Sequence, residues 1–330
     1  MRVNQRARRT NFRTHQDSFR YNHQAMTKKI NSILIYGYGV MGRGVASTFA
    51  KHGFDTTVRS SRAASLKDLP PGVRAVDKLP ATPPDLVLEL VPEDVATKQA
   101  VYKELEATWP GADYLIATGT SGLDLVELAK PLKHPERFLG LHYFMPADQA
   151  LVVEVMAGPQ TPPALVDIAA EALRRSGKEP VVLYKPIVGF LVNRLQHAIL
   201  HEAYYLIEKG VASAADIDHA ARRMLAPRMC ITGLIEQKDI SGLGIHAGAQ
   251  ASIVPELFHN HMPNPMLQSM VKDGETGAAA GKGFYDWAGC DVEAARKQSS
   301  AQLAKLTEYL DSGVNAPAPR TQPKPRDPRR

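Results

Sequence analysis

Cysteine is scarce in this chain, with only Cys230 and Cys290 among 330 residues. Two cysteines exclude a disulfide framework and are typical of a reducing compartment. Long apolar runs are also missing, because no stretch approaches the roughly 20 residues that a helix needs to span a bilayer. The first residues lack the apolar segment of a secretory signal. We therefore expect a cytoplasmic protein that stays out of the membrane, and we find no pattern that predicts a metal site.

Acidic residues are almost absent from the two ends of the chain. Residues 1–30 carry eight Lys or Arg and one Asp, a net charge of +7, and residues 311–330 carry +3. Since the whole chain carries +6, residues 31–310 carry −4. The basic character belongs to two polar tails, which we expect to be disordered and which do not indicate nucleic-acid binding. Two interpretations of the first tail are open: an organellar presequence over residues 1–25, or translation that begins at Met26.

Short apolar runs alternate with helical stretches between residues 31 and 185. This alternation predicts a Rossmann-type, doubly wound parallel sheet. We expect strands over 32–36, 56–58, near 74, and over 85–91, 114–117, 138–142, 151–155 and 180–184. We expect helices over 41–52, 92–109, 123–130 and 163–176.

After residue 185 the strand pattern ends. One long amphipathic helix is predicted over 187–209, and helical segments continue to about residue 310. We therefore expect a dinucleotide-binding domain over 31–185 and an all-α domain over 186–310. Because so few helices cannot build a self-sufficient core, we expect a homodimer formed through this second domain.

A glycine-rich turn joins the first expected strand to the first expected helix: Gly37-Tyr38-Gly39-Val40-Met41-Gly42. In dinucleotide-binding domains the first glycine permits the tight turn, the second lets the pyrophosphate approach the backbone, and the third lets helix pack on strand. The phosphates then lie at a helix N-terminus, which favours anions. A plain strand-to-helix turn is the alternative. The context favours a dinucleotide site formed by Gly37, Gly39, Val40, Met41 and Gly42.

The end of the second expected strand carries serine where NAD-binding domains usually carry an acid. That acid accepts hydrogen bonds from the ribose 2′-hydroxyl, and here the run is Arg59-Ser60-Ser61-Arg62. Serines flanked by arginines suit a 2′-phosphate, through charge-assisted and bidentate contacts. The run therefore favours NADP over NAD, and a solvated loop in an NAD-binding protein is the alternative.

Several further segments occur in the order and character of one enzyme family. They are ELVPEDVATK (89–98), ATGTSGL (117–123), GLHYFMPADQALVVEV (140–155), GFLVNRL (189–195), EKGVASAADID (208–218) and GKGFYDW (281–287). On these residues the chain resembles the 3-hydroxyacyl-CoA dehydrogenase family over about residues 32–290. The resemblance implies a nicotinamide-dependent oxidoreductase acting on a 3-hydroxy or 3-oxo group.

The resemblance assigns His142 as the catalytic base and Glu154 as its partner. Removal of hydride from a carbinol carbon requires a base for the hydroxyl proton, and histidine titrates near neutral pH. Two adjacent strands with a short link can bring these side chains together, so that the carboxylate orients the imidazole. For an isolated histidine at a strand end, a structural role is the alternative.

The resemblance also implies contacts for five more residues. Ser121 and Asn193 match residues that bind the substrate oxygen; the alternatives are a helix cap for Ser121 and interdomain packing for Asn193. Glu93, Lys98 and Lys282 match cofactor-contacting positions, although the spacing of Glu93 and Lys98 also suits a solvated helix face.

The chain departs from the family pattern in one region that matters for substrate. The family has a long helical excursion after the second strand, which helps to hold coenzyme A. Here only residues 61–73 separate that strand from the next, and Pro70-Pro71-Gly72 within them cannot build a helical hairpin. Two further departures are Met145 and Gly119, at positions where the family usually has asparagine. Two substrates stay open: a 3-hydroxyacyl-CoA or a smaller 3-hydroxy acid.

Two other functions compete with this interpretation. A β-hydroxyacid dehydrogenase of the 6-phosphogluconate type shares the glycine turn, but it has a lysine about one turn before its asparagine, and residues 188–192 contain none. A non-catalytic dinucleotide-binding protein, either a redox sensor or a crystallin-like protein, would not need both His142 and Glu154.

Overall fold

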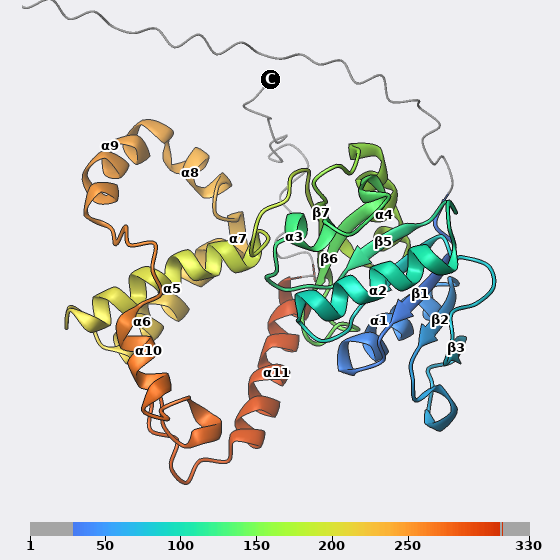
Figure 1. Ribbon diagram of the computed structural model, residues 1–330. Coiled ribbons are helices and arrows are strands. Elements are labelled where there is room, and N and C mark those ends of the chain that lie inside the picture. Colours follow the sequence, from blue (N-terminus) through green and yellow to red (C-terminus); the bar gives the residue numbers. More distant parts are fainter. Residues whose placement is uncertain (1–28, 311, 313–330) are drawn as a thin grey trace, which may run out of the picture. The chain divides into compact units, whose positions relative to one another are not determined.

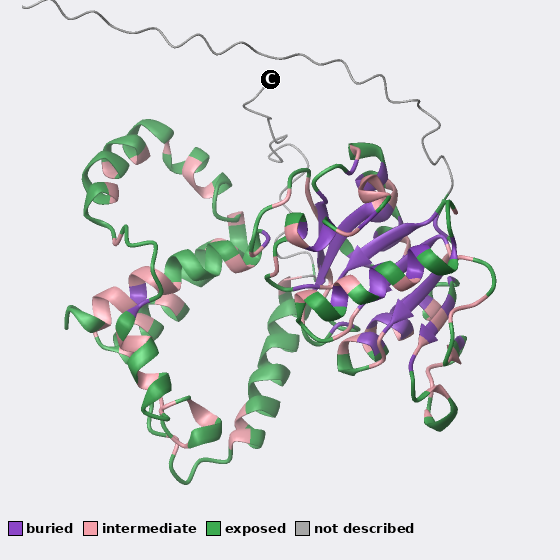
Figure 2. Ribbon diagram, viewed as in Figure 1, coloured by how far each residue is buried: buried purple, intermediate pink, exposed green. Residues whose placement is uncertain are grey.

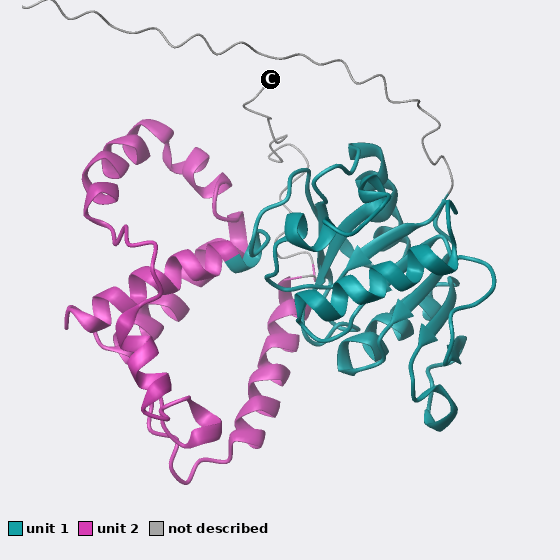
Figure 3. Cartoon of the chain, viewed as in Figure 1, with its two compact units in different colours: residues 1–193 teal, residues 194–330 magenta. Residues whose placement is uncertain are grey.

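The computed structural model describes residues 29–310 and 312, and the chain divides into two units between Asn193 and Arg194 (Figure 3). Apart from Lys29, Ile30 and Ser312, the expected tails lie outside the described residues. Ile30, which the sequence places in the first tail, is buried in the core of unit 1.

Unit 1 is built on one eight-stranded sheet in the order β3-β2-β1-β4-β5-β6-β7-β8 (Figure 1). Every expected strand is present. Helices cover both faces of the sheet, so the strands are buried on both sides, and strands of this kind appear in a sequence as nearly continuous apolar runs. The strands are β1 (Ser32–Tyr36), β2 (Asp55–Arg59), β3 (Val73–Val76), β4 (Leu86–Glu89), β5 (Leu115–Thr118), β6 (Phe138–Tyr143), β7 (Val152–Ala157) and β8 (Glu179–Leu183).

Four helices of unit 1 cover the sheet. Helices α1 and α4 share one buried cluster with Ile33 and Ile35 of β1, and α2 and α3 share the other with Leu34 and Val87. Asp94 begins α2 by accepting a hydrogen bond from the Thr97 amide at 2.8 Å. The helices are α1 (Val40–Lys51), α2 (Val95–Thr108), α3 (Leu125–Ala129) and α4 (Pro163–Arg175).

The sheet is parallel except between β6 and β7, which run antiparallel. Their link is too short for the crossover that parallel neighbours require. The ladder sets His142 directly opposite Glu154. The antiparallel pairing of β6 with β7 departs from the expected parallel arrangement. It places the two expected catalytic residues side by side.

The predicted helix over 187–209 begins later than expected, as α5 (Val192–Glu208). Gly189 and Phe190 have φ values of 82° and 52°, in the left-handed region that interrupts a helix. For a phenylalanine this backbone is costly, and complete burial of its ring offsets the cost. The predicted start was wrong because the tertiary packing of Phe190 overrides the helical pattern.

Unit 2 contains the rest of α5 and six further helices in its described residues, with a π-helical turn at Ala221–Leu225. In its described part only Ala203 and Asn264 are buried, so most helical faces are exposed (Figure 2). No helix within the described ranges is long and apolar enough to cross a membrane. The six helices are α6 (Ala214–Ala220), α7 (Ala226–Thr232), α8 (Glu236–Ser241), α9 (Leu243–Ile253), α10 (Pro265–Lys272) and α11 (Val292–Tyr309).

Candidate active site

The three glycines of the turn meet different surroundings. Gly37 has φ 110°, and a Cβ there would lie 2.6 Å from the Leu90 carbonyl oxygen. A Cβ on Gly42 would lie 2.2 Å from the Gly37 carbonyl oxygen, whereas one on Gly39 would meet nothing within 4 Å. Gly37 and Gly42 are therefore required by the fold, and Gly39 leaves open space above the backbone.

The start of α1 fits the pyrophosphate of a dinucleotide. Gly39 is the residue before the helix, no side chain caps it, and the first turn contains no acid. The amides of the first turn are free in an α-helix and attract anions together with the helix dipole. The exposed backbone at Gly39 and the uncapped amides of Val40 and Met41 are the groups that would hold the phosphates.

Arg59, at the end of β2, is turned toward the side chains of neighbouring elements. Its guanidinium lies 4.7 Å from the centre of the Tyr36 ring and 3.9 Å from a carboxylate oxygen of Glu104. Burial and the hydrogen bond to Glu104 raise the pKa of Tyr36 to about 12. Ser60 accepts a hydrogen bond from the Arg62 amide through its hydroxyl at 3.2 Å. Of the two arginines expected to bind a 2′-phosphate, only Arg62 is left without such contacts among the described side chains.

His142 and Glu154 form a buried pair. The distance from Nδ1 of His142 to Oε2 of Glu154 is 2.7 Å, and their side chains are 5% and 0% exposed. The other carboxylate oxygen of Glu154 accepts hydrogen bonds from the amides of Leu191 at 2.8 Å and Val192 at 2.9 Å. The carboxylate therefore joins the base to the start of α5.

These contacts determine which nitrogen of His142 can act as a base. Burial alone would raise the pKa of Glu154, but hydrogen bonds from His142 and from the amides of Val192 and Leu191 lower it overall. An ionised carboxylate only accepts hydrogen bonds, so Nδ1 of His142 must donate the proton in this contact. The neutral ring then carries its lone pair on Nε2, which has no hydrogen bond to another described residue.

Two aromatic rings enclose the imidazole. Phe144 lies 4.7 Å from it in an edge contact, and Phe190 lies 5.0 Å from it in a tilted one. Gly140 makes room for the second ring, since a Cβ there would lie 2.9 Å from Cζ of Phe190. The rings fix the plane of the imidazole and exclude water from its faces.

Ser121 and Asn193 are brought together as well. Nδ2 of Asn193 donates to the Ser121 carbonyl at 3.2 Å, while the Ser121 hydroxyl has no hydrogen bond to a described residue. The capping alternative for Ser121 is wrong, because Asp124 caps α3. Thr120 hydrogen-bonds Glu93, whose Oε1 also accepts from the Ser121 amide at 2.8 Å. Glu93 thus holds the turn that presents Ser121.

Lys98 is buried, so the solvated-face alternative is wrong for it. Its ammonium lies 2.7 Å from Glu89 and 3.4 Å from Glu93. Glu89, fully buried, also accepts from the hydroxyls of Tyr102 and Thr118, both at 2.9 Å. A connected set of polar groups therefore runs from the interior of β4 through Lys98 and Glu93 to the turn at Ser121.

Lys282 belongs to unit 2, where its ammonium is 2.5 Å from the Glu275 carboxylate. That ion pair and the attraction of Asp286 raise the pKa of Lys282 above its ordinary value. Its expected contact with a cofactor stays a prediction.

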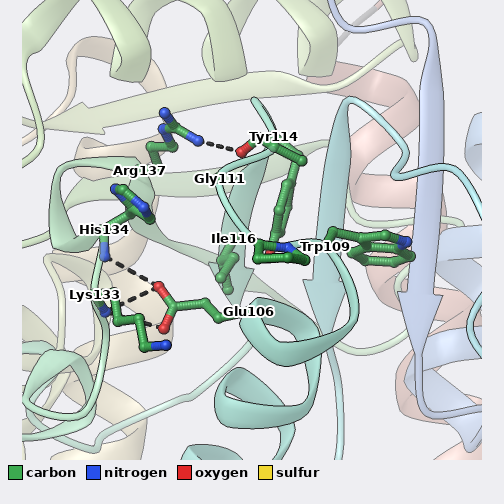
Figure 4. Close-up of a pocket in the computed structure, with 10 residues that line it drawn as sticks. Glu106, Trp109, Gly111, Tyr114, Ile116, Lys133, His134 and Arg137 are labelled. Atoms are coloured by element: carbon green, nitrogen blue, oxygen red, sulfur yellow. Dashed lines mark hydrogen bonds between the residues drawn. The ribbon is translucent and has the colours of Figure 1, made fainter.

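A separate cavity of about 60 Å³ lies at the amino-terminal ends of β5 and β6 (Figure 4). Figure 4 shows the Glu106 carboxylate directed at the backbone amides of Lys133 and His134, which donate to it at 2.9 to 3.0 Å. None of the residues expected to act in catalysis or to bind the cofactor lines this cavity.

Three groups at the site were not predicted from the sequence. Glu89 is an acid within an apolar run, a pattern that could have indicated a buried partner for Lys98. Phe190 lies in a segment whose pattern predicts a helix. Thr120 is the residue before Ser121, which the resemblance assigns to the substrate oxygen. Nothing in the local sequence distinguishes the last two.

Family models match both units. The NAD-binding domain of 3-hydroxyacyl-CoA dehydrogenase matches residues 72–187, and the C-terminal domain of that enzyme matches residues 189–287. The 3-hydroxybutyryl-CoA dehydrogenase of Mycobacterium tuberculosis is 30% identical over 79% of this chain and 100% of its own length. The 5-formyl-3-hydroxy-2-methylpyridine 4-carboxylate 5-dehydrogenase of Mesorhizobium japonicum is 27% identical over 86% of this chain and 99% of its own.

Solved structures of related enzymes resemble this chain as well. A crystal structure of the pyridine carboxylate 5-dehydrogenase, described as an NAD⁺-dependent dismutase, has a TM-score of 0.77 at 27% identity and covers 86% of this chain and 99% of its own. A 3-hydroxyacyl-CoA dehydrogenase from Archaeoglobus fulgidus has a TM-score of 0.62 at 29% identity, covering 85% and 99%. These matches set aside the 6-phosphogluconate interpretation. The chain belongs to the 3-hydroxyacyl-CoA dehydrogenase family and is an NAD-dependent oxidoreductase of the class that acts on a CH–OH group.

Proposed function

We propose that this chain transfers hydride between NAD and the hydroxyl-bearing carbon of a small hydroxy acid that carries no coenzyme A. The observation that supports the reaction is the buried pair of His142 and Glu154, with Nε2 of the imidazole left for a substrate proton. A non-catalytic dinucleotide-binding protein has no need of this pair.

In oxidation, Nε2 of His142 takes the hydroxyl proton as the carbinol carbon loses hydride. A bound nicotinamide ring supplies the hydride acceptor. Glu154 keeps the proton of His142 on Nδ1 and stabilises the imidazolium that forms. The Ser121 hydroxyl and the Asn193 amide bind the reacting oxygen, and Glu93 and Lys98 hold the Ser121 turn beside the coenzyme.

The absence of a coenzyme A excursion supports a small substrate. Between β2 and β3 the chain forms only a single 3₁₀ turn at Ala63–Ser65 before β3 begins at Val73. The Mesorhizobium japonicum relative is named for a pyridine carboxylate rather than a CoA thioester. A compact carboxylate-bearing substrate agrees with both observations.

NAD as the coenzyme replaces the preference for NADP that the sequence favours. Arg59 lies over the Tyr36 ring and 3.9 Å from Glu104, which leaves Arg62 as the less constrained of the two arginines for a 2′-phosphate. The structure with a TM-score of 0.77 is described as NAD⁺-dependent. The ratio of kcat/KM for NAD to that for NADP should exceed about ten. A ratio below one that rises in Arg62→Ala would instead establish the 2′-phosphate site.

A substrate panel tests the proposed function. We would assay 3-hydroxybutyrate and 3-hydroxybutyryl-CoA, each with NAD and with NADP. Beside them we would assay 5-formyl-3-hydroxy-2-methylpyridine 4-carboxylate, the aldehyde for which the relative is named. The proposal predicts a higher kcat/KM for a free acid than for the thioester. Efficient turnover of the thioester would show that the excursion is dispensable, and no turnover of any CH–OH compound would overturn the proposal.

We also propose that unit 2 associates with a second copy of this chain. The isoleucines of residues 226–253 are exposed to solvent, and Ile235 and Ile245 are 73% and 78% exposed. A monomer rarely exposes many large apolar side chains in one region. Sedimentation velocity should give twice the monomer mass, and Ile235→Glu with Ile245→Glu should reduce it to one. A parent chain that sediments as a monomer would contradict the dimer.

A further inference from the structure

Lys178, between α4 and β8, is a buried cation whose ammonium contacts only backbone oxygens. It donates to the carbonyls of Ala147 and Ala150, both at 2.7 Å, and to that of Asp148 at 3.3 Å. The residue is 5% exposed, and its ammonium forms no ion pair with a described residue. Burial lowers the pKa of Lys178, and the charge of Asp148 offsets part of that effect. Three donors meet three acceptors, which is what a buried ammonium requires.

The three carbonyls all belong to the link between β6 and β7. This link joins the strand of His142 to the strand of Glu154. Lys178 therefore holds the loop that connects the base to its carboxylate, although it contacts neither of them.

The same link packs against the helix that begins at the glycine turn. A Cβ on Gly44 of α1 would lie 3.2 Å from Cβ of Ala147 and 3.2 Å from the amide nitrogen of Asp148. The contact is close because position 44 has no side chain. The link is thus fixed on one side by the ammonium and on the other by the helix whose first turn would hold the coenzyme phosphates.

We propose that Lys178 is a positioning residue of the dehydrogenase reaction. By fixing the link against α1, it sets the position of His142 relative to the helix turn that would hold the coenzyme phosphates, and so the distance between Nε2 and the substrate hydroxyl. Hydride and proton transfer depend steeply on such distances, and a displacement of about 1 Å costs on the order of a hundredfold in rate. This inference rests on the proposed function.

Lys178→Met tests the role because it keeps the length of the side chain and removes all three donors. We expect kcat/KM for NAD to fall at least about tenfold, with a higher KM for NAD. The deuterium isotope effect on kcat, measured with NAD and the best hydroxy substrate of the panel deuterated at its hydroxyl-bearing carbon, should increase. A lysine that serves stability alone would reduce the amount of active enzyme and leave both of these quantities at the parent values. Lys103→Met, at an exposed lysine of α2 with no recorded partner, is the matched control.

Gly44→Ala perturbs the same contact from the other side. Alanine is favoured over glycine within a helix by about 1 kcal/mol, and this gain offsets part of the cost of the crowded contact. The new methyl group must push Ala147 and Asp148 by a few tenths of an ångström, and it should raise KM and the isotope effect in the same direction as Lys178→Met. This variant tests the effect of the position of the link on the reaction even where Lys178→Met fails to fold.

Parent values of KM and isotope effect in both variants would overturn the inference while leaving the dehydrogenase function intact. A parent enzyme that turns over no panel substrate would refute the proposed function and this inference with it. The two failures are therefore distinguishable.

Discussion

Glu154 lies directly opposite His142 in the antiparallel ladder and holds its Nδ1 at 2.7 Å with one oxygen, while its other oxygen receives two amides at the start of α5. One buried carboxylate thus fixes the base, the strand register and the beginning of the helix that carries Asn193. The following predictions concern this carboxylate and the groups arranged around it.

Glu154→Gln should reveal how the carboxylate contributes to stability. Because its folded pKa is lowered from the ordinary 4.5, its contribution is present above about pH 4.5 and is lost as pH falls through the lower folded value. At pH 7 the variant should lose about 2 kcal/mol of unfolding free energy, as for charged hydrogen bonds. Urea unfolding from pH 3 to 7 measures this, and the difference from the parent should shrink at acid pH. A difference that is constant with pH would contradict the assignment.

Much of unit 1 could be predicted from the sequence, because alternating apolar runs and helical stretches identify strands and helices locally. His142 and Glu154 followed from a motif, and their pairing followed from the short link. Long-range packing decided the remainder. The ring of Phe190 imposes a left-handed backbone inside a helical pattern, and the Glu89 carboxylate draws Lys98 into the core. Arg59 contacts Tyr36 and Glu104 rather than extending from the strand end.

Gly39→Ala should separate coenzyme binding from folding. A methyl group there meets no protein atom within 4 Å but occupies the space needed by a pyrophosphate. We expect NADH, followed by fluorescence titration, to bind at least about tenfold more weakly, a loss of about 1.4 kcal/mol. The free energy of unfolding should stay within about 1 kcal/mol of the parent.

Gly42→Ala is the matched comparison, because its methyl group would lie 2.2 Å from a backbone oxygen. It should lose both stability and NADH binding. If Gly39→Ala binds NADH as tightly as the parent does, the phosphates do not lie at this turn.

Ser121→Ala should lower activity without affecting stability. Its hydroxyl has no hydrogen bond to a described residue, so its removal leaves no buried group unpaired. As a donor to the reacting oxygen, it should be worth about a hundredfold to a thousandfold in kcat. Thr120→Val should instead reduce the melting temperature, because the Thr120 hydroxyl holds Glu93 and accepts from the Leu123 amide at 2.9 Å. Parent-like kcat in Ser121→Ala would remove Ser121 from the reaction.

His142→Gln tests the central claim most directly, when hydride transfer and NADH binding are measured on the same preparation. The imidazole is the proposed base and has no part in holding the coenzyme phosphates. The predicted result is a fall in kcat of about a hundredfold to ten-thousandfold, with the Kd for NADH unchanged. A variant that keeps turnover within about threefold of the parent would show that His142 is not the base.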